Sequence, residues 1–200
     1  SATKYLGGHS DLIAGGASGS AEAMGKVKEF RTFLGGMLDP HSAWMLARSM
    51  ETLHVRVERQ QENAGHLLAH LRELCGPEAI SSAWKEDLTT MGEDISIAEQ
   101  QQRGGGSMIG LTVPGGREGA FAFLDALTVF KLAVSLGSTE SLAEHPASMT
   151  HAGVPAEAKV RMGITEGFVR LSVGLEHPED LKEDVAHAWK VACEVANLPV

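Results

Sequence analysis

The sequence predicts an α/β fold, and three of its features carry that prediction. Residues 107–136 indicate a strand, an amphipathic helix and a second strand, the order typical of an α/β unit. A helical periodicity runs from residue 40 to residue 74. A strictly alternating segment at 168–173 precedes a last amphipathic helix, which begins at Pro178. With 200 residues, 43% of them apolar, the chain suits one large or two small domains.

Charge and hydropathy limit the classes of partner. The net charge of -9 and the pI near 5.4 argue against a nucleic acid or an anionic membrane. Charges of both signs are mixed along the chain, so the acidity is interpreted mainly as solubility. No apolar run approaches the roughly 18 residues of a membrane helix, and no signal peptide is recognised. We therefore expect a cytoplasmic protein.

Cysteines and histidines are sparse and scattered. Cys75 and Cys193 lie far apart without a CxxC motif, which fits a reducing cytosol better than a disulfide framework. A disulfide between the two stays open. His66 and His70 have the i, i+4 spacing of metal ligands, but no third ligand accompanies them. Surface histidines are the favoured interpretation, and no metal is expected.

A chemically useful lysine lies in the first eleven residues. Lys4 follows two hydroxyl residues and precedes the Gly7-Gly8 turn. If the site is desolvated, the ammonium form is disfavoured and the free amine can form a Schiff base with a carbonyl. Ser1 and Thr3 lie two positions apart, so in an extended segment both hydroxyls can donate to one phosphate. These groups are what pyridoxal 5'-phosphate requires, although spacing alone favours a solvated turn lysine.

Shorter elements follow the lysine segment. Small apolar residues and glycines at 12–20 predict a short buried strand and a tight turn. A weak helical pattern covers 21–30, and 31–36 is predicted as a loop. Asp39 followed by Pro40 predicts a helix start, because aspartate is a good N-cap and proline has a preset φ.

The long helical pattern covers residues 40–74, with a kink expected at 52–54. Its apolar side chains recur three and four positions apart and predict one buried stripe. Charged and amide side chains, including Arg56 and Gln60, are predicted to cover the exposed surface. Gly76, followed by a proline, predicts the end of the helix.

The second half of the chain alternates strands and helices. Strands are predicted at 79–84, 107–113 and 132–136, and helices at 118–129 and 155–162.

In the alternating segment 168–173 the aliphatic side chains face one way, and Arg170 and Ser172 face the other. A guanidinium binds a carboxylate through two parallel hydrogen bonds, which lysine cannot do. From the pattern alone, a salt bridge to a neighbouring acid is the favoured role of Arg170.

Three blocks of the sequence have the form of signatures. Residues 1–11 contain Ser-Ala-Thr-Lys-Tyr followed by Gly-His-Ser-Asp. Residues 134–142 are Val-Ser-Leu-Gly-Ser-Thr-Glu-Ser-Leu, and residues 145–151 are His-Pro-Ala-Ser-Met-Thr-His. Residues 167–176 are Gly-Phe-Val-Arg-Leu-Ser-Val-Gly-Leu-Glu. In this order they resemble the signatures of the Cys/Met-metabolism family of pyridoxal-phosphate enzymes, and together they span nearly the whole chain.

The resemblance implies a fold type I (aspartate-aminotransferase-like) α/β architecture, of which the chain is the C-terminal portion. Residues 1–56 would end the large cofactor-binding domain, and 57–200 would form a C-terminal α/β domain. Family members carry a substantial N-terminal portion before this lysine, so a missing N-terminal half or a complementary subunit is an expected partner. By the same resemblance we expect a homo-oligomer, a tetramer built as a dimer of dimers.

The resemblance also implies roles for individual residues. Lys4 would hold pyridoxal 5'-phosphate covalently and later act as the base at Cα of the substrate, with Ser1 and Thr3 binding the cofactor beside it. Ser135, Thr150 and Arg170 would bind the amino acid substrate. Arg170 then becomes the anchor of the substrate α-carboxylate, together with the Ser135 backbone.

The implied activity is metabolism of sulfur amino acids by γ-elimination of a C–S bond. Such a methionine or cystathionine γ-lyase gives a 2-oxo acid, ammonia and a thiol. Many cystathionine-cleaving relatives have a glutamate, which meets a second amino group, where this chain has Val134. An apolar residue there favours an apolar or small γ-substituent. Ser138 departs from the family's usual glycine and leaves the fine shape of this loop open.

Two alternatives remain from the sequence. One is γ-replacement on an O-acyl-homoserine, as in cystathionine γ-synthases or homoserine sulfhydrylases. The other is a non-catalytic fragment or subunit that needs an N-terminal half, since the aromatic residue and the aspartate that contact the cofactor ring lie upstream in relatives.

Overall fold

The computed structural model describes residues 1–90 and 95–199 and divides into two compact units. The first comprises Ser1–Val55 and the second Arg56–Val200. The assignment of the two units to a large cofactor domain and a C-terminal domain stays a prediction. Among the helices of the described residues, none has the length and apolar character needed to cross a membrane.

The first unit contains two helices and the start of a third. α1 (Ala21–Leu34) begins where the hydroxyl of Ser20 accepts a hydrogen bond from the Ala23 backbone N–H. The helix continues through 31–34, so the loop predicted there is wrong. It ends at Gly35, which has a φ of +81° that glycine adopts at little cost.

The strand predicted at 12–20 is also wrong, because this segment has no regular secondary structure. Leu12 is buried, but Ile13 is 86% exposed. Strands need a partner for their backbone groups, and the described residues of the first unit contain no strand. The glycines that suggested close backbone approach instead raise the entropy cost of any ordered strand.

The N-terminus of α2 (Pro40–Met50) confirms the predicted cap. An Asp39 carboxylate oxygen accepts a hydrogen bond from Ser42 N at 3.0 Å, and hydrogen bonds from Ser42 lower the pKa of Asp39. The predicted kink is confirmed as a break, since α2 ends at Met50 and α3 (Leu53–Cys75) begins at Leu53. Gly76, with φ of +80°, follows the end of α3 as expected.

The second unit is built on a five-stranded mixed sheet, which confirms the α/β class. Its strand order is β1-β2-β5-β4-β3, with β3 and β4 parallel and the other neighbours antiparallel. The bounds are β1 (Ile80–Ser82), β2 (Met108–Thr112), β3 (Lys131–Leu132), β4 (Leu142–Glu144) and β5 (Phe168–Ser172). β3 is shorter than the predicted strand, and β4 was not predicted.

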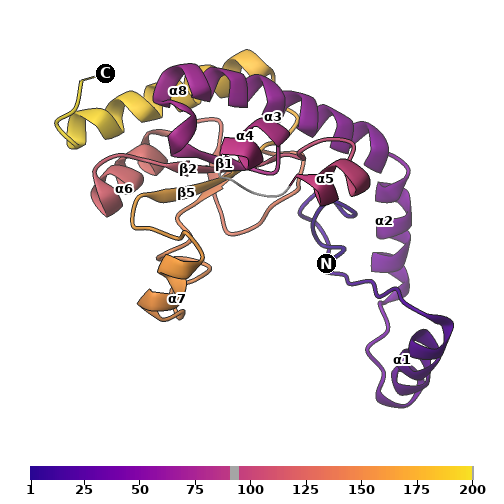
Figure 1. Cartoon of the computed structure of the whole chain (residues 1–200). Helices are drawn as coiled ribbons and strands as arrows, with labels where there is room; N and C mark the ends of the chain where they lie inside the picture. The colour runs from indigo at the N-terminus through magenta and orange to yellow at the C-terminus, as the bar shows by residue number, and fades with distance from the viewer. Residues whose placement is uncertain (91–94, 200) are drawn as a thin grey trace. The chain divides into compact units, whose positions relative to one another are not determined.

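The remaining helices of this unit are short except for α6 and α8. Their bounds are η1 (Pro77–Ala79), α4 (Lys85–Thr90), α5 (Ser96–Gln101), α6 (Gly116–Ala126), α7 (Ala156–Arg161) and α8 (Pro178–Val195). Figure 1 shows α3 and α8 running along the same side of β2 and β5.

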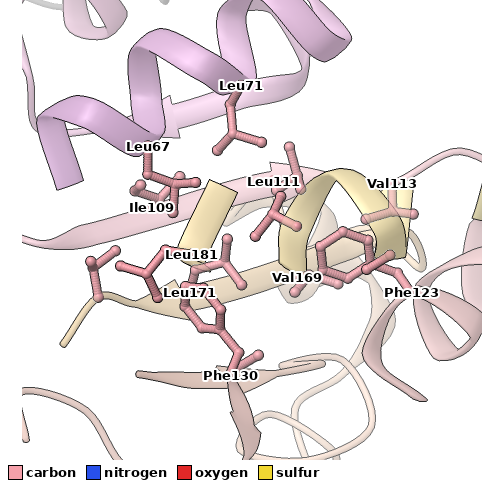
Figure 2. Packing of buried hydrophobic residues seen from close by; sticks show 14 of the residues in the cluster. Leu67, Leu71, Ile109, Leu111, Val113, Phe123, Phe130, Val169, Leu171 and Leu181 are labelled. Atoms are coloured by element: carbon pink, nitrogen blue, oxygen red, sulfur yellow. The ribbon is translucent and has the colours of Figure 1, made fainter. Parts of the chain in front are cut away.

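The core of the second unit lies between the sheet and the helices α3, α6 and α8. Figure 2 shows Leu67 and Leu71 of α3 pointing toward Ile109 and Leu111 of β2. All four side chains are at most 1% exposed. Burial of each stabilises the fold by roughly 1.5–3 kcal/mol relative to an exposed side chain. Val169 and the other aliphatic residues of β5 join this core, as the alternating pattern predicted.

One face of α3 is polar yet buried, which corrects the expected exposure of two residues. Arg56 is 4% and Gln60 0% exposed. Gln60 Nε2 donates to the Ser138 carbonyl at 2.6 Å, and Asn63 Nδ2 donates to the Gly174 carbonyl at 3.0 Å. Helical periodicity cannot reveal this, because the covering loops come from 78 and 111 residues further along the chain.

The face of the sheet opposite the core carries a row of aligned residues. Ser81 on β1 is opposite Gly110 on β2, which is opposite Arg170 on β5, which is opposite Glu144 on β4. Residues in register across neighbouring strands share one face of a sheet. The sheet therefore places Arg170 and Glu144 side by side, away from the aliphatic core.

Candidate functional site

Lys4 lies in a compact turn of the first unit. Gly7 N donates to the Ala2 carbonyl at 2.8 Å, and Gly8 N donates to the Lys4 carbonyl at 2.7 Å. The backbone packs closely at Gly7, where a Cβ would lie 3.0 Å from the Ala2 carbonyl oxygen. The lysine itself is half-buried, on a backbone that the turn holds in place.

The neighbouring hydroxyls differ in their surroundings. Ser1 is exposed. Thr3 Oγ1 accepts a hydrogen bond from Ala14 N at 3.0 Å and lies 3.3 Å from the Ala14 carbonyl oxygen, to which it donates. A hydroxyl has one proton to donate. Binding of a phosphate by Thr3 would therefore require that proton to leave the Ala14 carbonyl, so the predicted role of Thr3 stays a prediction.

His9 ties this turn to α2. Its Nδ1 lies 2.7 Å from the Gly7 carbonyl oxygen, which requires the proton on Nδ1. The same nitrogen lies 3.4 Å from Oγ of the buried Ser49 on α2. The histidine of the first signature thus supports the shape of the turn that carries Lys4.

A second cluster surrounds Arg170 in the second unit. Nη1 of Arg170 lies 2.8 Å from Oε1 of Glu144, and Nη2 donates to the Ser135 carbonyl at 2.9 Å. Nη2 also lies 3.4 Å from the Val134 carbonyl oxygen. The salt bridge expected from the pattern is present, and the Ser135 backbone lies beside Arg170.

Thr150 reaches the same cluster through Glu144. Its Oγ1 lies 3.1 Å from Oε1 of Glu144 and 2.9 Å from Nδ1 of His151. The structure therefore brings Ser135 and Thr150 to the Arg170–Glu144 pair, Ser135 through Arg170 and Thr150 through Glu144. Whether they bind substrate stays a prediction, because their contacts with one another do not identify a ligand.

The cluster has unused hydrogen-bonding capacity. Nε of Arg170 and Oε2 of Glu144 are buried, and neither has a hydrogen-bond partner among the described residues. The Arg170 side chain is 22% exposed, whereas that of Glu144 is fully buried. A buried donor without a partner is costly in a native protein. The Arg170 side chain is partly exposed and a guanidinium has five N–H donors, so the contacts with Glu144 and Ser135 still leave N–H groups for a ligand carboxylate.

An open groove runs beside Arg170 along this face of the sheet. It has a volume of about 460 Å³, and its lining includes Ser81 and Met108 as well as Gly110, Phe168 and Arg170. A Cβ on Gly110 would lie 2.6 Å from the Phe168 ring. The absence of a side chain on Gly110 therefore leaves room for this ring next to the arginine.

The loop after β3 is fixed to its surroundings by backbone hydrogen bonds. Gly137 N donates to Ser172 Oγ at 2.9 Å, next to Arg170 on β5. The buried Ser138 carbonyl accepts from Gln60 of α3. The Ser138 hydroxyl oxygen is buried without a partner among the described residues. The serine that replaces the family's usual glycine thus has room in the loop at the cost of an unsatisfied hydroxyl.

Sequence reasoning missed Glu144. β4 has only three residues, too few for an alternating pattern to be recognised. Its position between residues 134–142 and 145–151, the two parts of the second signature, was the one available signal. Among the described residues, no group of His, Cys, Asp and Glu side chains could hold a metal ion.

A family model and individual relatives match most of the chain. The family model for the Cys/Met metabolism PLP-dependent enzymes matches residues 1–190. The chain is 40% identical to an L-methionine γ-lyase of Pseudomonas putida over 194 residues, which are 96% of the chain and 48% of that protein. It is 39% identical to a cystathionine γ-lyase of Bacillus subtilis over 189 residues, 94% of the chain and 48% of that protein.

Among solved structures, a cystathionine γ-synthase of Xanthomonas oryzae in complex with aminoacrylate and cysteine matches with a TM-score of 0.83 and 35% identity. The match covers 96% of the chain and 49% of that structure. The predicted fold type I architecture is confirmed by this likeness. The chain spans about half the length of the relatives it matches.

Proposed function

Because the chain belongs to the Cys/Met metabolism PLP-dependent enzyme family, we propose that its protein eliminates the γ-substituent of a sulfur amino acid. One water molecule is consumed, and the products are a 2-oxo acid, ammonia and a thiol. The observation that carries this proposal is the cluster in which the partly exposed Arg170 contacts the Ser135 carbonyl through Nη2 and has further N–H groups to donate. Two family signatures meet there, and the cluster offers a cation to an amino acid carboxylate.

The residues of the Lys4 turn fit the cofactor of the family. Lys4 supplies a primary amine for the aldehyde, and the exposed Ser1 supplies a hydroxyl for the phosphate. Thr3 is a further donor once its hydroxyl leaves the Ala14 carbonyl. When bound, pyridoxal 5'-phosphate supplies the electron sink that stabilises negative charge at the substrate Cα.

The side chains of the chain have distinct roles in this reaction. Arg170 holds the α-carboxylate through charge-assisted hydrogen bonds and so fixes the orientation of the amino acid. The Lys4 amine takes the proton from Cα as a general base. Loss of a second proton, from Cβ, then allows the γ-substituent to leave with the electrons of the C–S bond.

Val134 favours methionine as the substrate. Its side chain is 53% exposed, and its carbonyl oxygen lies 3.4 Å from Arg170 Nη2. An apolar residue at this position cannot pair with the second ammonium of cystathionine. We infer that an uncharged thioether is the preferred γ-substituent.

A second candidate function is γ-replacement on an O-acyl-homoserine. The likeness to a cystathionine γ-synthase structure, with a TM-score of 0.83 and 35% identity, favours it. In this reaction a thiol adds at Cγ to form a new thioether. For either activity we expect a cytoplasmic homo-oligomer, a dimer of dimers, that includes the N-terminal half or a complementary subunit.

A product assay separates these functions. The protein that carries this chain, loaded with pyridoxal 5'-phosphate, is incubated with methionine, cystathionine or O-acetylhomoserine, each with and without an added thiol. Elimination predicts a 2-oxo acid and methanethiol from methionine without added thiol. Product that forms only with both an acylated homoserine and a thiol would replace elimination by γ-replacement. No product from any substrate, with the cofactor bound, would support a non-catalytic role.

A further inference from the structure

Glu144 faces the proposed carboxylate anchor from the neighbouring strand. Glu144 on β4 and Arg170 on β5 are direct cross-strand neighbours in an antiparallel pair. Their side chains lie on the face opposite the core and meet at 2.8 Å. The carboxylate is 0% exposed, so its charge has no access to water and is compensated by the guanidinium.

The guanidinium is held at two of its three nitrogens. Glu144 Oε1 engages Nη1, and the Ser135 carbonyl engages Nη2. The third nitrogen, Nε, has no partner among the described residues. Because a guanidinium is planar, contacts at two nitrogens fix the plane of the whole group and the directions of the N–H donors that remain on the partly exposed side chain.

Glu144 is itself held in place by a hydrogen bond from Thr150. The Thr150 hydroxyl donates to Oε1, the same oxygen that engages Arg170. The short antiparallel pairing of β4 with β5 fixes the backbone of both partners. The Glu144 carboxylate is therefore held in one position, and its contact with Arg170 orients the guanidinium.

From this geometry we propose that Glu144 is a positioning residue that orients Arg170 toward the α-carboxylate of the substrate, an inference that rests on the proposed function. It contacts no reacting atom in this role. Its contribution is the acceptor oxygen Oε1, and its negative charge partly offsets the attraction of the site for an anion. Substitution of Glu144 can therefore separate the effect of its negative charge from the effect of its acceptor oxygen.

Three variants separate these effects. Glu144→Gln keeps an acceptor oxygen at the same reach and removes the charge. Glu144→Ala removes both the acceptor and the charge, and Glu144→Asp keeps the charge but shortens the reach by one carbon. Glu166→Ala is the matched control, because Glu166 pairs with Arg117 at 2.6 Å on an exposed surface.

Binding is measured by isothermal titration calorimetry on the cofactor-loaded protein with L-norleucine, which resembles methionine but has no sulfur to eliminate. Positioning predicts that Glu144→Gln binds at least as tightly as the unsubstituted protein. Glu144→Ala and Glu144→Asp should bind about tenfold more weakly than Glu144→Gln, which corresponds to about 1.4 kcal/mol. L-Norleucinamide, which has no carboxylate, should show no such difference. The control should bind norleucine normally.

The measured affinities show whether Glu144 positions Arg170. Equal affinity of Glu144→Gln, Glu144→Ala and Glu144→Asp for norleucine would overturn the proposal, as would a matching loss for norleucinamide. If Glu144→Ala does not fold, the comparison of Glu144→Asp with Glu144→Gln decides. Absence of norleucine binding by the unsubstituted protein would also overturn it. Norleucine binding with the predicted order of affinities, but no turnover of methionine, would reject γ-elimination and leave the role of Glu144 standing.

Discussion

The carbonyl oxygen of Ser135 lies 2.9 Å from Nη2 of Arg170, although the two residues are 35 positions apart. Ser135 belongs to the second signature and Arg170 to the third. The pairing of β4 with β5 and the hydrogen bond from Gly137 to Ser172 bring the two signatures together. The contact makes Arg170 the residue whose substitution is most informative about substrate binding.

Arg170→Ala should raise the KM for the amino acid substrate with a smaller effect on kcat. The variant loses charge-assisted hydrogen bonds to the α-carboxylate, and we expect about a 100-fold increase, or roughly 3 kcal/mol. Steady-state kinetics on methionine measures this. Arg117→Ala, which removes an exposed arginine of a surface ion pair, is the control and should leave KM unchanged. An unaltered KM in Arg170→Ala would remove this residue from the substrate site.

Val134→Glu should shift preference toward cystathionine. A carboxylate at this position can pair with the second ammonium of that substrate, and we expect the ratio of kcat/KM for cystathionine to that for methionine to rise at least about tenfold. Leu132→Glu is the control, since Leu132 is similarly exposed, at 57% against 53%. If both variants change the ratio equally, a general effect of added charge explains it and Val134 does not select the substrate.

Asp184 should prove important for stability. Its buried carboxylate accepts hydrogen bonds from the backbone N–H groups of Thr128, Val129 and Phe130, and from the Thr128 hydroxyl. Asp184→Ala leaves these donors buried without an acceptor and should lower the free energy of unfolding by about 3 kcal/mol. Urea denaturation measures the change. Asp180→Ala, at an exposed position of the same helix, should be nearly neutral, and equal losses in both variants would contradict this account.

Cys75 should be unreactive near neutral pH. Burial, followed by the nearby Glu78, raises the pKa of its thiol to about 11. Alkylation by iodoacetamide should therefore be slow at pH 8 and accelerate toward pH 11. Because the unfolded thiol ionises at lower pH, this residue stabilises the fold below about pH 8.5, and that contribution is lost as pH rises toward 11.

The comparison with Cys75→Ala isolates this effect. The variant should lose less stability than the unsubstituted protein between pH 9 and pH 11. Rapid labelling of Cys75 at pH 8 in the folded protein would show that its thiol is not buried as described. Burial also raises the pKa of the Cys193 thiol.

Local signals predicted many of the elements. Three features depend on only a few neighbouring residues: the Asp39 cap, the glycine after α3 and the alternation of β5. All three predictions were confirmed. The strand expected at 12–20 failed because a strand depends on a partner that local pattern does not report. The same limitation explains Gln60, whose burial depends on a loop 78 residues away.

Motif resemblance predicted members of the Arg170 cluster but not the residue at its centre. Ser135, Thr150 and Arg170 were named from the signatures, whereas Glu144 emerged only from the cross-strand register. An acid in a three-residue strand has no periodic signal, and its burial is a property of the sheet. The sequence thus predicted three members of the cluster, and the sheet geometry added the acid that contacts the arginine.

The central claim is that the Lys4 amine binds pyridoxal 5'-phosphate covalently. Reduction of the cofactor-loaded protein with borohydride, followed by peptide mass spectrometry, tests it directly. We predict a phosphopyridoxyl group on Lys4, absent from Lys4→Ala and retained when the exposed Lys26 is replaced by alanine. A label on another lysine, or no label on a protein that binds the cofactor, would contradict the account.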